Sequence, residues 1–139
     1  MSLTTILVAG LLSGLVSINT GYLIVGFLFQ PLPLQSSSLW RAAPKPRPYL
    51  LSVPVTLLYC LGIALLYTLS RGLPGMVTLG WLQQGTAFGA LCWAAFLAPG
   101  TLSKAVFLKL KTDFVLGTLL NDLITCLIAG TVTAWLLSL

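Results

Sequence analysis

The side chains best suited to chemistry are few, and the most conspicuous of them is an acid inside an apolar segment. The chain has two acidic residues, Asp113 and Asp122, and no histidine. Asp122 lies about ten residues, or ~15 Å at the helical rise, inside the last apolar segment. An ionised carboxylate at the centre of a bilayer costs at least ~2.5–3.5 kcal/mol, so it has to be paired, protonated or hydrated. Asp122 is therefore the first candidate for a functional residue.

Further polar side chains fall at comparable depths in the other apolar segments. Asn19 lies about eleven residues, or ~16 Å, from the far end of the first segment, and Tyr59 lies at a similar level. We expect Asn19, Tyr59 and Asp122 to form an intramembrane polar layer, and Gln83 and Gln84 to line an outer vestibule. Three interpretations stay open: a site for a proton, cation or small polar ligand, a network that fixes helix register, or a contact between Asp122 and another subunit.

The sequence lacks the side chains that catalysis or metal binding would require. Without histidine, with only two carboxylates and with no clustered nucleophile and base, acid–base or triad chemistry has no complete set of residues. The three cysteines, Cys60, Cys92 and Cys126, all lie in apolar segments, which is typical of packing residues and not of a disulfide framework or a metal site. We expect no enzymatic activity, no catalytic residue, no metal and no cofactor.

The composition is that of a membrane protein. Of the 139 residues, 58% are hydrophobic and 6% are charged, whereas about 25% of the residues of a soluble domain are charged. The mean hydropathy of +1.03 points the same way. A soluble fold with so few charges could not cover its surface, so the sequence predicts an integral membrane protein.

Four segments are long enough to cross a bilayer, which requires about 20 mainly apolar residues. They run from about Leu3 to Phe29, Leu50 to Leu69, Met76 to Leu97 and Phe114 to Leu137. Pro99-Gly100 is expected to end the third. The predicted fold is a single all-α membrane domain, an antiparallel bundle of four transmembrane helices. Its cytoplasmic connections are 30–49 and 98–113, and the composition of the second also suits a short interfacial helix.

The basic residues predict an orientation. Arg71 alone lies in the short connection between the second and third segments. The two longer connections carry Arg41, Lys45, Arg47, Lys104, Lys109 and Lys111. Cytoplasmic loops are enriched in Lys and Arg, so these connections should face the cytoplasm, touch anionic lipid headgroups and leave both termini outside. No basic run is interleaved with aromatic residues, so nucleic acid is not an expected partner.

Small residues predict where helices approach each other. Gly10 and Gly14 in the first segment, and Gly85 and Gly89 in the third, have the GxxxG spacing of close helix contacts. Their simplest use is packing within one chain. A dimer interface is the alternative, and a homo-oligomer or a larger membrane complex remains attractive for so small a bundle.

The second half resembles a known family. Gly89-Ala90-Leu91-Cys92-Trp93-Ala94-Ala95-Phe96, a following proline and a last helix ending Gly130-Thr131-Val132-Thr133-Ala134-Trp135 are similar to the bacterial membrane family catalogued as domain of unknown function 1761. The resemblance implies a small four-helix protein of the bacterial inner membrane and supplies no functional residue. The function we expect is a structural or accessory membrane subunit, with a small transporter or channel around Asp122 as the alternative.

Overall fold

All regular structure in the described part of the chain is helical. The computed structural model describes residues 3–24, 47–108, 110 and 112–139. Its elements are α1 (Leu3–Ile24), α2 (Arg47–Ser70), α3 (Pro74–Val77), α4 (Trp81–Cys92), η2 (Trp93–Leu97), α5 (Ala98–Phe107) and α6 (Thr112–Leu136). Four stretches are long and apolar enough to cross a membrane: Leu3–Gly21, Ser52–Ser70, Trp81–Phe107 and Thr112–Leu136. The prediction of an all-helical chain with four such stretches is confirmed.

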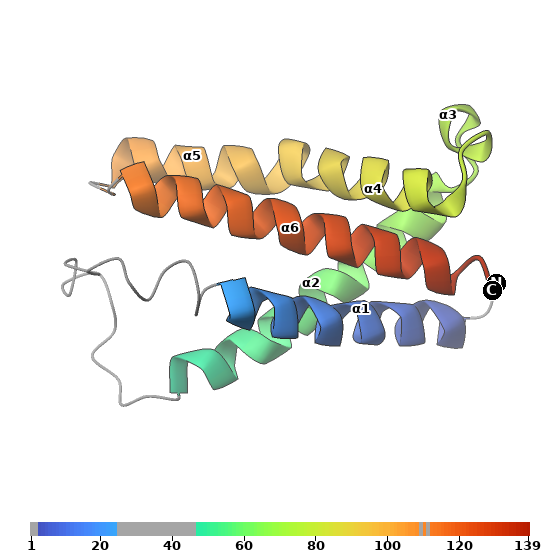
Figure 1. The fold of residues 1–139 in the computed structure, drawn as a ribbon, viewed down its shortest axis with the longest axis horizontal. Coiled ribbons are helices and arrows are strands. Elements are labelled where there is room, and N and C mark those ends of the chain that lie inside the picture. The colour runs from blue at the N-terminus through green and yellow to red at the C-terminus, as the bar shows by residue number, and fades with distance from the viewer. Residues whose placement is uncertain (1–2, 25–46, 109, 111) are drawn as a thin grey trace.

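The long helices pack around α6. Figure 1 shows that α1 begins and α6 ends at the same end of the molecule, and that successive long stretches run in alternating directions. The most extensive packing joins α4 to α6, followed by α1 to α2 and α1 to α6. In Figure 1, α2 lies obliquely across the other long helices. Because α6 touches α1, α2 and α4, its side chains decide how the two halves of the chain meet.

The third stretch is longer than predicted, and its expected end at Pro99-Gly100 is wrong. The helix continues as α5 to Phe107, through residues that we assigned to a connection. A proline inside a helix removes one amide donor and presses its ring against the carbonyl four residues earlier. Here η2, a π-helical segment in which the Ala98 amide donates to the Trp93 carbonyl, opens the helix directly before Pro99. The wider turn relieves that clash, so the helix passes through the proline.

Other boundaries shift by a few residues. The second helix begins at Arg47, three residues before the predicted start, which places Pro54 inside the helix. The short helix α3 occupies Pro74–Val77, so the third long stretch begins at Trp81 and not at Met76. Residues 25–46, with the rest of the predicted first connection and its Arg41 and Lys45, lie outside the described residues, as do Lys109 and Lys111.

The tightest packing occurs where glycines let two backbones meet. A Cβ added to Gly85 would lie 2.7 Å from the Thr131 Cα and 2.8 Å from the Gly130 carbonyl oxygen. One added to Gly89 would collide with the Cys126 carbonyl oxygen. Gly85 and Gly89 thus lie against the backbone of α6 at Gly130, and the predicted GxxxG of the third segment packs within the chain.

The GxxxG of α1 serves a second intramolecular contact. A Cβ on Gly10 would lie 2.9 Å from the Leu61 Cα, and one on Gly14 would lie 2.8 Å from a Leu57 methyl group. Both leucines belong to α2. The two glycine pairs therefore close two different helix contacts, α1 with α2 and α4 with α6.

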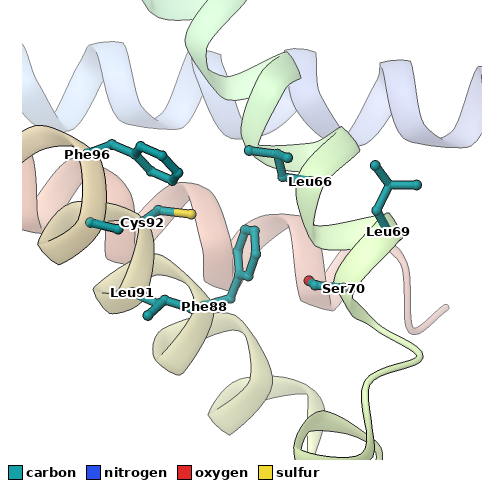
Figure 2. A pocket seen from close by; sticks show the side chains of 8 residues that line it. Leu66, Leu69, Ser70, Phe88, Leu91, Cys92 and Phe96 are labelled. Atoms are coloured by element: carbon teal, nitrogen blue, oxygen red, sulfur yellow. The ribbon is translucent and has the colours of Figure 1, made fainter.

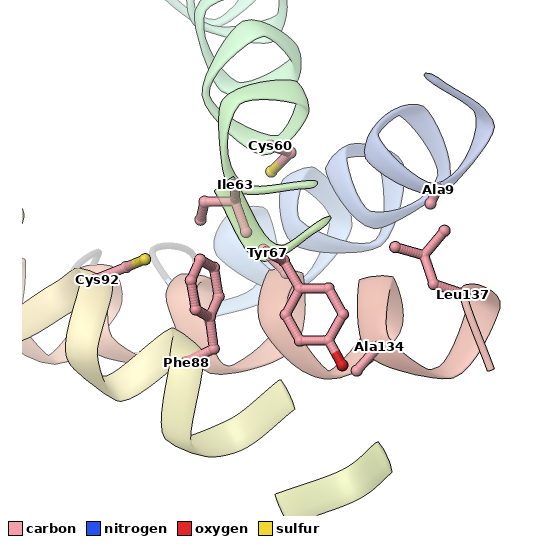
Figure 3. Close-up of a cluster of buried hydrophobic side chains, with 9 residues drawn as sticks. Ala9, Cys60, Ile63, Tyr67, Phe88, Cys92, Ala134 and Leu137 are labelled. Carbon is pink, nitrogen blue, oxygen red and sulfur yellow. The ribbon is translucent and has the colours of Figure 1, made fainter. Parts of the chain in front are cut away.

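A small core joins these contacts. Figure 3 shows buried side chains from all four long stretches, among them Ala9, Cys60, Tyr67, Phe88 and Ala134. The rings of Tyr67 and Phe88 meet edge to face, with centroids 5.4 Å apart and an interplanar angle of 79°. Cys60, Cys92 and Cys126 are all free and buried, and Cys60 and Cys92 belong to the core cluster, in agreement with their prediction as packing residues.

We expect Gly89→Ala to destabilise the protein by about 1–3 kcal/mol, because the new methyl group has to push the α6 backbone away. Chemical unfolding in a mild detergent measures the change. Gly100→Ala is the matched control, since a Cβ there meets no atom within 4 Å; in a helix it should be neutral or stabilise by up to about 1 kcal/mol. Equal effects of the two substitutions would contradict the role of the glycine contact.

Candidate functional site

Asp122 lies at the contact between α6 and α5. Its Oδ2 accepts a hydrogen bond from the Thr101 hydroxyl at 3.4 Å, and the side chain is partly buried. Lys104, one turn further along α5 and exposed, and Asn121, the preceding residue on α6, complete its electrostatic environment. This cluster of Thr101, Lys104, Asn121 and Asp122 is called the Asp122 cluster below. Two of its members, Thr101 and Lys104, belong to α5, which the sequence analysis assigned to a connection outside the membrane helices.

The structure does not join the three residues of the predicted polar layer to one another by hydrogen bonds. Asn19 is exposed, and its amide donates to the Leu15 carbonyl of its own helix at 2.9 Å. The Tyr59 hydroxyl pairs with the Cys126 sulfur at 2.9 Å. Asp122 instead bonds Thr101. The helical rise gives each residue's height, but which helix face meets which neighbour depends on packing, and this is why depth alone did not identify the partners.

Three buried side-chain oxygens have no hydrogen-bond partner among the described residues: Ser17 Oγ, Asn121 Oδ1 and Thr133 Oγ1. Asn121 Oδ1 lies near α1, 3.9 Å from where a Cβ on Gly21 would be. Ser17 is one helical turn from Gly21 on the same face of α1. The Asn121 oxygen therefore lies at the contact between α6 and α1 without a hydrogen-bond partner among the described residues, whereas Ser17 lies beside Cys60 of α2.

The two glutamines predicted to line an outer vestibule differ in role. Gln83 is exposed. Gln84 accepts a hydrogen bond from the Tyr67 hydroxyl at 2.8 Å and donates to the carbonyls of Met76 and Leu79, each at 2.8 Å. Gln84 thus fastens the connection between α2 and α4 to both helices, which is a structural task.

A second hydrogen bond between chain segments lies at the same end of the molecule. Arg71, directly after α2, donates from Nη1 to the Leu137 carbonyl at 2.8 Å. Leu137 follows the last residue of α6, where helix carbonyls lack intrahelical donors. The Arg71 guanidinium therefore ties the end of α2 to the end of α6.

The described residues hold no group of three or more His, Cys, Asp or Glu side chains that could bind a metal ion. One hollow on the surface of the structure is lined almost entirely by apolar side chains. It is a groove of about 420 Å³ between α2 and the α4–η2 segment, seen in Figure 2. Its lining consists of Leu66, Leu69, Ser70, Phe88, Leu91, Cys92, Ala95 and Phe96. We call it the lateral groove; its one polar side chain, Ser70, already donates to the Tyr67 carbonyl at 3.0 Å.

We expect Gln84→Met to lower stability by about 1–3 kcal/mol, because the Met76 and Leu79 carbonyls and the Tyr67 hydroxyl lose their shared partner. Thermal unfolding in detergent measures the shift. Gln83→Met, an identical change at the exposed neighbour, should leave stability within about 0.5 kcal/mol. An equal loss in both variants would argue against the fastening role of Gln84.

No family model matches the chain, and neither the curated proteins nor the solved structures include one that is detectably similar. The resemblance of the second half to the family catalogued as domain of unknown function 1761 therefore stays a prediction.

Proposed function

We propose that the protein is an integral membrane protein that crosses the bilayer four times as an antiparallel bundle. The support is the distribution of its apolar side chains. Large hydrophobic residues such as Leu58, Leu69 and Leu116 lie exposed on four helical stretches of membrane-spanning length. In water such a surface would drive aggregation, whereas hydrocarbon solvates it.

The bacterial inner membrane is the proposed location, with both termini outside and the basic connections in the cytoplasm. Arg47 begins α2, and Lys104 lies exposed in the last turn of α5. Figure 1 shows these two helix ends at one end of the molecule, opposite the end where α6 finishes. The positive-inside rule then assigns the Arg47 and Lys104 end to the cytoplasm, where basic residues such as the exposed Lys104 can contact anionic headgroups.

We expect reporter fusions to the N-terminus and to the C-terminus to report the same, non-cytoplasmic compartment. Alkaline phosphatase, which is active only outside the cytoplasm, and a fluorescent protein that matures inside it are the paired reporters. A fusion after Leu108, between α5 and α6, should report the cytoplasm. Termini in opposite compartments would overturn the four-span topology.

We propose a structural or accessory role within a membrane assembly, as a homo-oligomer or as a subunit of a larger complex. The observation that carries this proposal is how the interior is used. Glycines bring α4 onto α6 and α1 onto α2, and Tyr59, Tyr67 and Gln84 bond other groups of the same chain. The lateral groove is apolar. Such an interior suits a scaffold better than a solute pathway, and co-purification from native membranes would identify the partner.

The Asp122 cluster favours a second candidate, a small transporter or channel for a proton, a cation or a small polar solute. A membrane-embedded acid is a functional hypothesis by default. Its neighbours Thr101 and Lys104 come from a helix with a π-helical turn, a feature frequent at functional sites. The Asn121 oxygen, which has no hydrogen-bond partner among the described residues, lies toward Gly21 of α1.

Asp122→Asn separates the two candidates. For a structural subunit we expect no proton or cation flux in liposomes from the wild type or the variant, and a change, if any, in oligomeric state only. Flux in the wild type that disappears in Asp122→Asn while assembly persists would establish transport instead. Asp113→Asn, in the exposed first turn of α6, is the matched control for loss of one negative charge.

A further inference from the structure

One side of α1 is exposed along the described length of the helix. On the other side, Ala9, Ser13 and Ser17 are buried at the contacts that α1 makes with α2 and α6. Figure 1 shows α1 at an edge of the molecule, separated from α4 by α6. Successive helix residues are about 100° apart, so Asn19 lies about 200° around the helix from Ser17 and faces outward.

The exposed side has the spacing of a seam between two helices. Val8, Leu12, Leu15 and Asn19 are all exposed and follow one another at steps of four, three and four residues. This alternation keeps the side chains on one stripe, and it is the spacing of left-handed helix pairs in coiled coils and membranes. We call these four residues the α1 seam. Because α1 contains no charged residue, no charge repulsion opposes close approach along the seam.

Asn19 lies inside the proposed membrane span and not at its edge. A Cβ on Gly21 would be 3.9 Å from Asn121 Oδ1, so these two residues are at about the same height. Asn121 lies ~14 Å along the helix axis from Thr112, where α6 begins, and Asn19 lies ~3 Å further from that end. The 25 residues of α6 exceed a hydrocarbon thickness of ~30 Å by ~8 Å. Even with all of that excess at the Thr112 end, Asn19 is ~9 Å inside the hydrocarbon.

The Asn19 amide has bonding capacity that its own helix does not use. One N–H donates to the Leu15 carbonyl at 2.9 Å, and this is the single hydrogen bond of the side chain among the described residues. An amide also has a second N–H donor and a carbonyl oxygen that accepts. Lipid chains offer these groups no partner, whereas a second helix with a donor and an acceptor at the same depth satisfies them.

A second copy of the chain meets this requirement by symmetry. Copies inserted in the same orientation bring their α1 helices together in parallel, so residues of the same number lie at the same depth. A two-fold axis along the membrane normal then places Asn19 opposite its counterpart, and each amide oxygen accepts a hydrogen bond from the other amide. Leu12 and Leu15 exclude lipid from the pair, as apolar residues do around a buried asparagine in a coiled coil.

We infer that the chain forms a parallel dimer through the α1 seam, with the two Asn19 amides paired across its axis. This inference rests on the proposed structural role in a membrane assembly. It names the partner in that assembly, a second copy of the chain, and the surface by which the copies meet.

The test is energy transfer between donor-labelled and acceptor-labelled full chains in phosphatidylcholine liposomes, over a range of protein-to-lipid ratios. The wild type should show a dimer. Asn19→Leu keeps the seam apolar and should weaken association about three- to thirtyfold, the range expected for one interhelical hydrogen bond. Asn19→Gln, which keeps the amide, should retain most of the association.

Thr20→Val is the matched control on the same helix. The Thr20 hydroxyl also bonds a carbonyl of its own helix, Val16, at 3.0 Å, but the residue lies about 100° around from Asn19. Its substitution should leave association unchanged. Melting temperatures of the three variants close to that of the wild type are expected, because both side chains bond only their own helix among the described residues.

Oxidative cross-linking locates the interface. Leu15→Cys should give a covalent dimer, because equivalent seam residues meet across the axis. Leu7→Cys has similar exposure, 45% against 51% for Leu15, but lies outside the seam and should not cross-link. The wild type provides the background, since its three cysteines are buried.

A wild type that stays monomeric at all ratios would overturn the inference. Equal association of Asn19→Leu and the wild type, or cross-linking as strong at Leu7→Cys as at Leu15→Cys, would overturn it as well.

Two further measurements separate failure of the dimer from failure of the proposed function. Release of the chain by alkaline carbonate would refute membrane insertion itself, and a retained but monomeric chain would refute the dimer alone. Flux that depends on Asp122, together with a dimer that Asn19→Leu weakens, would refute the structural role and leave the interface standing.

Discussion

The contact between α4 and α6 is the constraint on which the rest of the structure depends. Gly85, Gly89 and Gly130 have no side chains to separate the two backbones, so dispersion contacts accumulate along the helices. Since α6 also receives α1 and α2, the position of α4 on it fixes where the remaining helices can lie. The lateral groove lies between α2 and the α4–η2 segment, beside the contact of Tyr67 with Phe88.

Several polar side chains form hydrogen bonds to nearby backbone carbonyls at one end of the molecule. Gln84 and Arg71 fasten chain segments that follow or precede long helices, and their partners are chiefly backbone carbonyls. Toward the other end, Asp122 accepts one hydrogen bond, from Thr101, and lies near Lys104 and Asn121. Gln84 makes three hydrogen bonds, so any functional rearrangement is better accommodated around Asp122 than around Gln84.

The sequence predicted the features that depend on composition and local spacing. Four helical stretches follow from apolar runs, and the pairs Gly10/Gly14 and Gly85/Gly89 pointed to intramolecular contacts that the structure contains. Gly130 was not predicted, because a single glycine has no spacing to recognise. Thr101 was missed as the partner of Asp122 because Pro99 is a local signal for a helix end. No pattern in the sequence predicts the π-helical segment that lets the helix continue through Pro99.

Because of that π turn, the position of Thr101 relative to Asp122 depends on the number of residues in η2 as well as on their types. One residue of an α-helix turns the chain by about 100°, and η2 holds an extra residue within its wide turn between Trp93 and Ala98. The indole of Trp93 donates to the Leu119 carbonyl at 3.0 Å, so the entrance to the turn is anchored on α6. Deleting one residue there would rotate Thr101 away from Asp122 while leaving every apolar residue in a helix. Substitutions within η2 are therefore better tolerated by the fold than insertions or deletions of the same size.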